Sequence, residues 1–500
     1  MKFNKNSKVL TEVLDVTKNY IEFKSSSDSL KDKQSLSLAQ YIHKCDNIHS
    51  YEWSNFQNIE QFGSFFISSN QFPLLEFIYR WGDDLQSIPK IQSFMSFHKN
   101  ESKECYRSKF QLISVIARPL LLILQETFWT GLMWSYLKYV HPFRPLFNLV
   151  NFDPKSASKS LLSAIYFAGF ITQTNHSIEI YSYMQGYAMC NIKKMLFKIN
   201  LSNAQALGIY AHAFYLNGNY SLSRVCLSHF GRMCNALGTG INRKKLHILD
   251  QHNRKLVHNI VKLYYNWEKL GRPPYGLASQ EDEFDLDIYE PKYQLPNSNL
   301  NLCNNDYEGA AYSVFCCQFT KISNFTVVVN SKFCQHDSNI IKMEIESLSS
   351  KANEIYNNTI LTLEPMINLI PEYKNRITEY LNLVKCSFIV CMLCIHSKML
   401  ESSENSNLGI IQNILDKGIE LWELMSSNKY LIDIWSFGPF IAGFHLIQIY
   451  PLCANNQKEK VLYILKSIIQ LYYREGYNIN SMNFLLLQTQ LKLINDKNLL

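Results

Sequence analysis

Apolar residues recur every three or four positions along most of the chain, and this spacing predicts helices. The stripe is strongest from residue 110 to residue 139, with a kink or restart expected at Pro119 because proline lacks the amide hydrogen that a helix interior needs. Asp153-Pro154 opens the next expected helix, which continues through residues 156–170. The remaining expected helices are 181–197, 202–216, 220–237, 249–270, 306–319, 337–360, 370–401, 407–425, 439–450 and 458–473.

Turn and cap residues arrange these helices in pairs. Ser202 or Asn203 is expected to cap the helix at 202–216, and Gly218-Asn219 supplies the turn before the chain returns through 220–237. A β-branched run at residues 325–329 is the best candidate for a strand, and it is too short to change the fold class. We therefore predict an all-α fold, a multi-helix bundle of antiparallel helical hairpins with one long acidic loop.

That loop follows a sharp helix stop. Gly271-Arg272-Pro273 should end the helix at 249–270, because glycine permits a left-handed helix end and proline prevents the helix from resuming. Such a long connection, to about Asn305, is uncommon inside a compact domain. We expect side chains to hold it in place, with Arg254 pairing with its carboxylates. The acids of the loop are Glu281, Asp282, Glu283, Asp285 and Asp287.

The composition fits a large globular core. The 500 residues are 47% hydrophobic and only 18% charged, and Gly and Pro are scarce, which favours helices packed on helices. The net charge of +7 is mild for this length, and basic doublets such as Lys193-Lys194 are isolated, so the chain lacks the clustered charge of a nucleic-acid surface. We divide the chain into a poorly defined, partly helical region at 1–109, a core at 110–305 and a C-terminal helical part of the same module at 306–500.

The pattern of cysteines and the apolar segments indicate the cellular compartment in which we expect the protein. Thirteen cysteines are scattered without even spacing, and the opening residues lack the pattern of a secretory signal, so we expect an intracellular protein with reduced thiols. Residues 434–457 carry no charged side chain and approach the length of a membrane span. Gly438-Pro439 and Pro451 interrupt them, so we interpret this segment as a buried core helix.

The search for chemistry returns no catalytic and no metal site. Cys386, Cys391, Cys394 and His396 come closest to a set of metal ligands, but their neighbours are apolar, which favours buried thiols. His247, His252 and His258 lack the spacing and the glutamate of a metalloprotease helix. No phosphate-binding glycine loop and no nucleophile elbow is present, and the acids at 281–287 do not match a calcium loop. We expect neither an enzyme nor a bound cofactor.

Several segments, taken in order, resemble the fungal-specific transcription factor domain, which is the regulatory middle region of fungal zinc-cluster regulators. The corner at 137–146, LKYVHPFRPL, is similar to the opening of that domain, and Asn203 to Leu207 with Gly218 is similar to its helical hairpin. Residues 232–238, RMCNALG, follow the arginine-apolar pattern of the family. The signature ends with Arg254, Gly271, Arg272, Pro273, Asp282, Asp285 and Asp287.

The resemblance implies that 110–305 is the core of a regulatory domain that senses an effector or docks partners in the nucleus. Implied partners are the RNA polymerase II transcription machinery or co-regulators, with a small-molecule effector and a homodimer left open. The family binds zinc and DNA through an N-terminal cluster of six cysteines, which this chain lacks, since only Cys45 and Cys105 precede residue 110. DNA binding would therefore need such a module elsewhere. An effector pocket among aromatic helices would be lined by Trp129, Trp134, Tyr264 and Trp267.

Two other readings of the sequence remain open. The hairpin at 202–237 is also typical of helical-repeat scaffolds, although no period is sustained over three copies. A membrane-associated helical protein would instead use Trp435 to Leu452 of the apolar segment. Both alternatives keep the all-α fold and differ from the leading one in localisation and partners.

Overall fold

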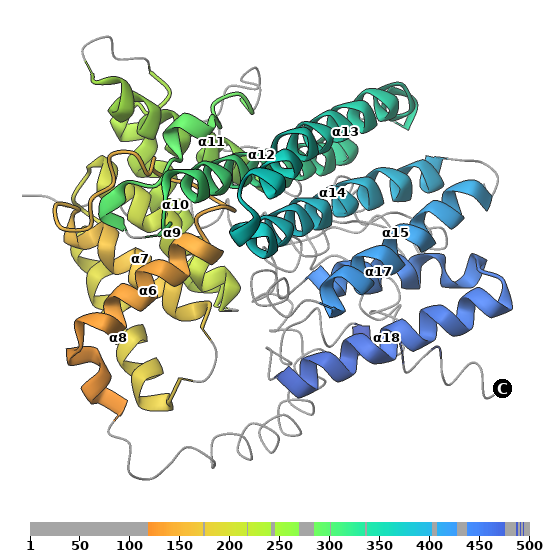
Figure 1. Ribbon diagram of the computed structural model, residues 1–500, viewed down its shortest axis with the longest axis horizontal. Helices are drawn as coiled ribbons and strands as arrows, with labels where there is room; N and C mark the ends of the chain where they lie inside the picture. The colour runs from red at the N-terminus through yellow and green to blue at the C-terminus, as the bar shows by residue number, and fades with distance from the viewer. Residues whose placement is uncertain are drawn as a thin grey trace, which may run out of the picture.

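The computed structural model is built from helices alone in the residues that it describes (Figure 1). Helices hold 81% of these residues and strands hold none of them, which confirms the predicted all-α bundle. The structure describes residues 119–173, 176–217, 219–241, 246–269, 285–300, 302–335, 338–402, 408–427 and 438–475, with 487, 488, 491 and 494. The expected N-terminal region at 1–109 lies outside them.

The first half of the described chain forms a cluster of short helices, which lies on the left in Figure 1. Within this cluster α7 is central, because it packs against α6, α8 and α9, while α9 and α10 form a close hairpin. In chain order the elements are the 3-10 helix η4 (Pro119–Leu124), α6 (Glu126–Tyr139), α7 (Lys159–Ile171), α8 (Ile178–Met195), α9 (Leu201–Leu216), α10 (Tyr220–Leu237) and α11 (Ile248–Lys269).

The second half consists of longer helices, on the right in Figure 1. The first three pack on one another, and the layer then continues from α14 through α15 and α17 to α18. One hydrophobic core runs through both halves. The elements are α12 (Asp306–Gln335), α13 (Ser338–Leu369), η7 (Pro371–Tyr373), α14 (Lys374–Ser402), α15 (Leu408–Ser426), α17 (Gly438–Ile449), η8 (Tyr450–Leu452) and α18 (Asn455–Glu475).

Polar side chains set the helix starts in the first half. Ser158 caps α7 by accepting a hydrogen bond from Leu161 N, so this helix begins at Lys159 and the expected opening at Asp153-Pro154 is wrong. Asp153 instead accepts from Lys155 N in a turn. Asn200 caps α9, and neither Ser202 nor Asn203 does so. Each cap satisfies a backbone amide that the first turn of a helix leaves without an acceptor.

Three expected elements differ from the structure. The candidate strand at 325–329 lies inside α12, which continues to Gln335. Within this helix, the hydroxyl of Thr326 donates a hydrogen bond to Ile322 O. α13 extends through Pro365 to Leu369 instead of ending at 360. The stripe from 110 to 139 is not one helix, because Gln125 is extended between η4 and α6. At 325–329, packing within the buried helix α12 outweighs the local preference of β-branched residues for strands.

Helix α17 covers the middle of the apolar segment 434–457, and most of its residues are buried, among them Phe440, Ala442 and Leu446. Among the described residues, one helical stretch, Pro371–Leu400, is apolar and long enough to cross a membrane. Its most apolar window is 78% buried inside the protein. Core packing accounts for both segments.

Candidate functional site

Residues 285–300 form a strap that joins the two halves of the protein. The strap holds two short turns, η5 (Pro291–Tyr293) and η6 (Ser298–Leu300), and η5 packs against α12. It is the described part of the long acidic loop. Its hydrogen-bond partners are distant from it in sequence and come from helix α6, the chain that follows α6, helix α11 and helix α12.

Backbone and amide groups fix the strap to the corner at 137–146 and to residues 147–149, which follow it. Leu149 N donates to Tyr293 O at 3.0 Å, which is a backbone contact across almost 150 residues. Gln294 is 1% exposed, and its amide accepts from His141 Nε2 at 2.9 Å and donates to Phe147 O at 3.4 Å. The strap is therefore held against this part of the chain, because the buried side chain of Gln294 satisfies polar groups of His141 and Phe147.

On α11, the buried Asn259 holds the start of the strap. Its amide donates from Nδ2 to Asp285 O at 2.8 Å and accepts at Oδ1 from Asp285 N at 3.3 Å. The same Nδ2 donates to the hydroxyl of Tyr289 at 3.0 Å, and Asn324 on α12 donates to that hydroxyl at 3.1 Å. Burial raises the pKa of Tyr289 well above its usual range, so the hydroxyl stays neutral. One tyrosine thus links α11 to α12 through the strap.

A buried arginine completes this network. Arg144, 9% exposed, comes from the corner and donates from Nη1 to Asn324 Oδ1 and to Phe143 O, both at 2.8 Å. Nearby, the hydroxyl of Thr320 on α12 donates to Pro142 O. The guanidinium group of Arg144 therefore fixes the orientation of the Asn324 amide, whose Nδ2 donates to the hydroxyl of Tyr289.

Two buried histidines each form a hydrogen bond to the strap through Nε2. His141 hydrogen-bonds through Nε2 to Gln294, and His252 through Nε2 to Ile288 O at 3.1 Å, while the His252 ring stacks on Tyr293 with centroids 3.8 Å apart. Each Nδ1 is buried without a hydrogen-bond partner. Burial lowers the pKa of His141 to about 4 and also lowers the pKa of His252. Both rings are therefore neutral at pH 7.

The pH dependence of stability should follow from the buried histidines. His141 and His445 each have a pKa lowered by burial to about 4. The unfolded chain then binds more protons between pH 6.5 and 4, so the stabilisation is complete above pH 6.5 and is lost as the pH falls toward 4. We expect a loss of about 3 kcal/mol for each histidine over that window.

The measurement is chemical denaturation at several pH values between 7.5 and 4.5. His141→Gln should flatten the fall in stability below pH 6.5. Equal slopes for the protein and for His141→Gln would contradict the neutral, buried state of His141.

Arg254 stabilises a helix end. Gly238 has φ 60°, and the bonds from Gly238 N to Asn235 O and from Thr239 N to Cys234 O close the end of α10 as a Schellman motif. Arg254 on α11 is 6% exposed, and its Nη2 donates to Leu237 O at 2.7 Å and to Gly238 O at 2.8 Å. Arg254 therefore donates to carbonyl groups at the C-terminal end of α10 and joins α11 to that end.

Gly238→Ala should destabilise the protein by about 1 kcal/mol, because side chains disfavour a positive φ. Its Cβ would also lie 3.1 Å from Ile241 Cδ1. Gly186→Ala is the matched control, since a Cβ there meets nothing within 4 Å. Thermal unfolding of both variants tests the motif, and a Gly238 variant as stable as the parent would refute it.

The structure locates part of the predicted signature. Asp285 and Asp287 are exposed on the strap, and Asp285 Oδ1 accepts from Asp287 N at 2.9 Å. The described contacts of Asp285 to α11 run through Asn259, a residue that the sequence reasoning did not single out. Gly271, Arg272, Pro273 and Asp282 lie outside the described residues, so the predicted Gly-Arg-Pro stop stays a prediction.

The expected effector pocket is only partly described. Trp129 packs against Tyr166 and Tyr187, with ring centroids 5.1 and 5.4 Å away, and donates to Ile123 O. Trp134 is 45% exposed and donates to Leu300 O at the end of the strap. The two tryptophans therefore contact different neighbours. The side chains of Tyr264 and Trp267 are outside the described set, so the pocket stays a prediction.

The thiols of α14 belong to the core. Cys386, Cys391 and Cys394 are buried there, and burial raises the pKa of Cys386 and of Cys391 to about 12, which keeps these thiols protonated. Among the described residues, no group of three or more His, Cys, Asp or Glu side chains is arranged to hold a metal ion. His445 on α17 hydrogen-bonds through Nδ1 to the hydroxyl of Ser397 at 2.8 Å, which satisfies two buried polar groups between α14 and α17.

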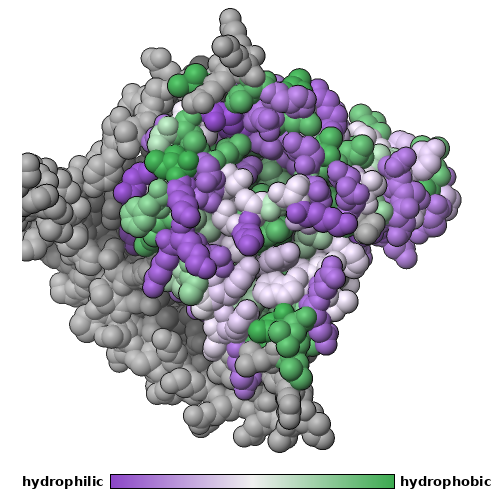
Figure 2. All heavy atoms as spheres, turned by 90° about the vertical axis from the view of Figure 1, so that its left-hand side faces the viewer, coloured by the Kyte–Doolittle hydropathy of each residue, from purple (hydrophilic) through white to green (hydrophobic). Residues whose placement is uncertain are grey.

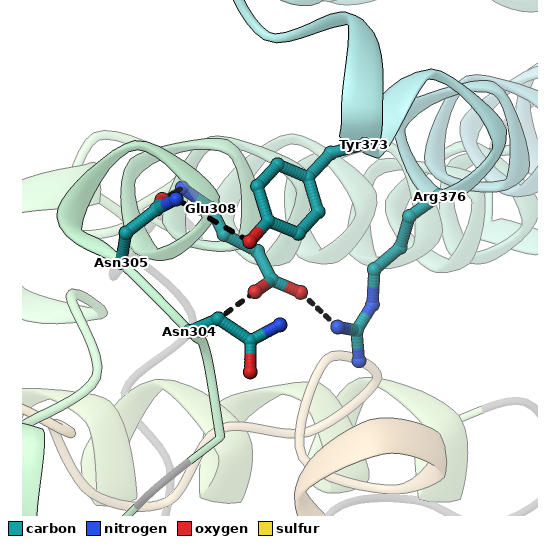
Figure 3. A network of polar contacts seen from close by, with 5 residues as sticks. All are labelled: Asn304, Asn305, Glu308, Tyr373 and Arg376. Atoms are coloured by element: carbon teal, nitrogen blue, oxygen red, sulfur yellow. Dashed lines mark hydrogen bonds and ion pairs between the residues drawn. The ribbon is translucent and has the colours of Figure 1, made fainter.

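A second buried network fastens α12 to α14, shown in Figure 3. Glu308 is 1% exposed, and its carboxylate accepts from Asn304 N at 2.7 Å and pairs with Arg376 of α14. Asn305 caps α12 by accepting from Glu308 N at 2.9 Å, and its amide donates to the hydroxyl of Tyr373. The arrangement resembles a capping box that a second helix closes, which fixes the start of α12 immediately after the strap.

No protein-family model, curated protein or solved structure matches this chain. The site must therefore be judged from its own geometry. Within the described residues, that geometry is a framework of buried polar contacts, both neutral and charged, that joins two helical halves.

Proposed function

We propose that the chain is a regulatory module of a fungal-type transcription regulator, which docks a partner or senses an effector and controls RNA polymerase II genes from the nucleus. The proposal comes from the order of the sequence segments described above. The observation that supports it best is that helix α11 and the strap link several of these segments. The corner at 137–146, the end of α10, Arg254 on α11 and the acidic strap all belong to one connected framework.

The physical basis of regulation would be a shift between two packings of the helical halves. A ligand or partner can move such an equilibrium only by binding one packing more tightly than the other. The strap is the natural element to respond, because a few hydrogen bonds from Asn259, Gln294 and Tyr289 hold it between the halves. Its exposed acids, Asp285 and Asp287, are available to a basic surface of a partner.

A reporter assay tests this proposal. The full chain, fused to an unrelated DNA-binding domain, should change reporter transcription several-fold relative to that domain alone. Asn259→Leu removes the amide that holds Asp285 and should alter the reporter signal further. The matched control is Asn353→Leu, because Asn353 lies exposed on α13 and its amide donates only to Ser349 O of the same helix.

Localisation provides the second test. The tagged full chain should be enriched in the nucleus. A reporter level equal to that of the DNA-binding domain alone, together with a cytosolic tag, would overturn the proposal in favour of a scaffold. Recovery of the chain in a membrane pellet that resists high salt would overturn it in favour of a membrane-associated protein.

A further inference from the structure

The turn between α8 and α9 carries exposed apolar side chains beside exposed lysines. Phe197 is 88% exposed and Ile199 is 57% exposed. Lys193 and Lys194 in the last turn of α8 are exposed as well, and so is Lys198. These five residues lie within seven consecutive positions, so they form one continuous surface, which we call the basic turn.

Hydrogen bonds hold the basic turn in place between the two helices. Lys198 N donates to Met195 O at 3.0 Å, and the side chain of Asn203 donates to Lys198 O at 2.7 Å. Asn200 then caps α9 by accepting from Asn203 N at 2.8 Å. The backbone of the turn is therefore ordered, while its largest apolar side chain, Phe197, remains in water, where a phenylalanine is unfavourable.

The hairpin of α9 and α10 brings a further apolar side chain to the same end (Figure 1). The hairpin is antiparallel, because Ser223 on α10 donates to Ala211 O on α9, and an added Cβ at Gly208 of α9 would lie 3.3 Å from the ring of Phe230 on α10. The start of α9, seven residues before Gly208, therefore lies beside the end of α10, seven residues after Phe230. Ile241 follows that end and is 64% exposed.

The charge of this part of the protein has a single sign. Residues 180–249 contain eight Lys and Arg and no Asp or Glu, so they carry a net charge of +8. The rest of the chain carries −1, since 41 of the 49 Lys and Arg and all 42 Asp and Glu lie there. Figure 2 looks onto the side formed by the helices of the first half and shows apolar residues among hydrophilic ones. No carboxylate within these residues offsets the charge of the basic turn.

We propose that the basic turn binds the surface of an anionic lipid membrane. Phe197 and Ile199 insert between the headgroups, and Lys193, Lys194 and Lys198 contact the anionic groups around them. Burial of apolar area and attraction to anionic lipids both strengthen this kind of interfacial binding. Each lysine close to such a surface contributes about a fivefold gain in affinity. The basic turn supplies both kinds of contact within one short segment.

The exposure and chemistry of the basic turn favour a lipid surface over a peptide or a nucleic acid. A peptide docks by placing its own side chains in a groove, whereas Phe197 and Ile199 themselves extend into water. Nucleic acids stack their bases on aromatic rings, and Ile199 has no stacking face. A membrane interface takes up aromatic and aliphatic side chains alike. This inference goes beyond the proposed function and does not rest on it.

Sedimentation of the full chain with lipid vesicles tests the proposal. The chain should bind vesicles of phosphatidylcholine with about one-third phosphatidylserine more than about tenfold more tightly than vesicles of phosphatidylcholine alone. Because salt screens the lysines, raising it from about 0.1 M to about 0.5 M should release most of the protein. Such release differs from the salt-resistant membrane recovery that would overturn the proposed function. Equal binding to both kinds of vesicle, or binding to neither, would overturn the lipid assignment.

Two double variants locate the binding surface. Lys193→Gln combined with Lys194→Gln should weaken binding to the anionic vesicles by about 25-fold. The matched control is Lys460→Gln combined with Lys466→Gln, which removes the same charge from exposed positions of α18 and should change the affinity less than about twofold. Equal losses in the two double variants would show that binding follows the total charge and would overturn the role of the basic turn.

Phe197→Ser tests the insertion of an apolar side chain. It should weaken binding to the anionic vesicles by about tenfold, because the phenyl ring no longer leaves water. Tyr463→Ser, which changes a side chain that is 70% exposed on α18, should leave the affinity nearly unchanged. Equal affinities of the Phe197 variant and the parent would overturn the insertion. Tighter binding to a DNA duplex or to an acidic peptide than to the anionic vesicles would overturn the choice of a lipid surface.

Discussion

Gly169→Ala is expected to destabilise the protein by about 3 kcal/mol or more, which is a large fraction of the stability of a typical fold. A Cβ at this position would lie 1.8 Å from Leu132 O, 2.8 Å from Leu132 C and 3.1 Å from Tyr136 N. All three are backbone atoms of α6, so no side chain can rotate away to make room. The variant can fold only if α7 separates from α6, and that would open part of the core around Leu132 and Tyr136.

The matched control variants should stabilise the protein instead of destabilising it. At Gly131 of α6 and Gly186 of α8 an added Cβ meets nothing within 4 Å. Because alanine has a higher helix propensity than glycine, Gly131→Ala and Gly186→Ala should stabilise by about 0.5–1 kcal/mol each. Thermal unfolding and denaturant titration of the three variants measure the difference. A Gly169 variant as stable as these controls would mean that α6 and α7 do not cross at that position.

The sequence predicted the helices because their signal is local. A spacing of 3.6 residues is present in the chain whatever surrounds it, and the second helix of the hairpin at 202–237 was located to the residue. The capping residue of α9 was missed by two positions, since Asn200, Ser202 and Asn203 can all serve as caps.

The polar framework could not be predicted in the same way. The expected pairing of Arg254 with the acidic loop stays a prediction, because Glu281, Asp282 and Glu283 lie outside the described residues. The hydrogen bonds of Arg254 that are described go to the carbonyl oxygens of Leu237 and Gly238. Asn259, five residues further along α11, is the residue that holds Asp285. Both side chains are polar residues on the same helix, and the sequence does not reveal which of them the loop passes. That choice depends on packing among α10, α11 and the strap.

The network around Glu308 leads to a second large expected effect. Arg376→Met should destabilise the protein by about 3 kcal/mol, because it leaves a carboxylate that is 1% exposed without its cation. The double variant with Glu308→Gln should recover most of this loss, since glutamine still accepts from Asn304 N and carries no charge. Denaturant titration of the two single variants and the double variant gives the coupling energy directly.

The control pair for this cycle is Lys351 and Glu354, which lie 3.1 Å apart on the surface of α13. Lys351→Met should cost less than about 0.5 kcal/mol, since water screens exposed ion pairs and their side chains lose entropy on pairing. The comparison separates two roles of Glu308. If Arg376→Met is as mild as Lys351→Met, the carboxylate acts through capping of α12 alone. If Arg376→Met is strongly destabilising and the added Glu308→Gln restores stability, the ion pair fastens α12 to α14 beside the end of the strap.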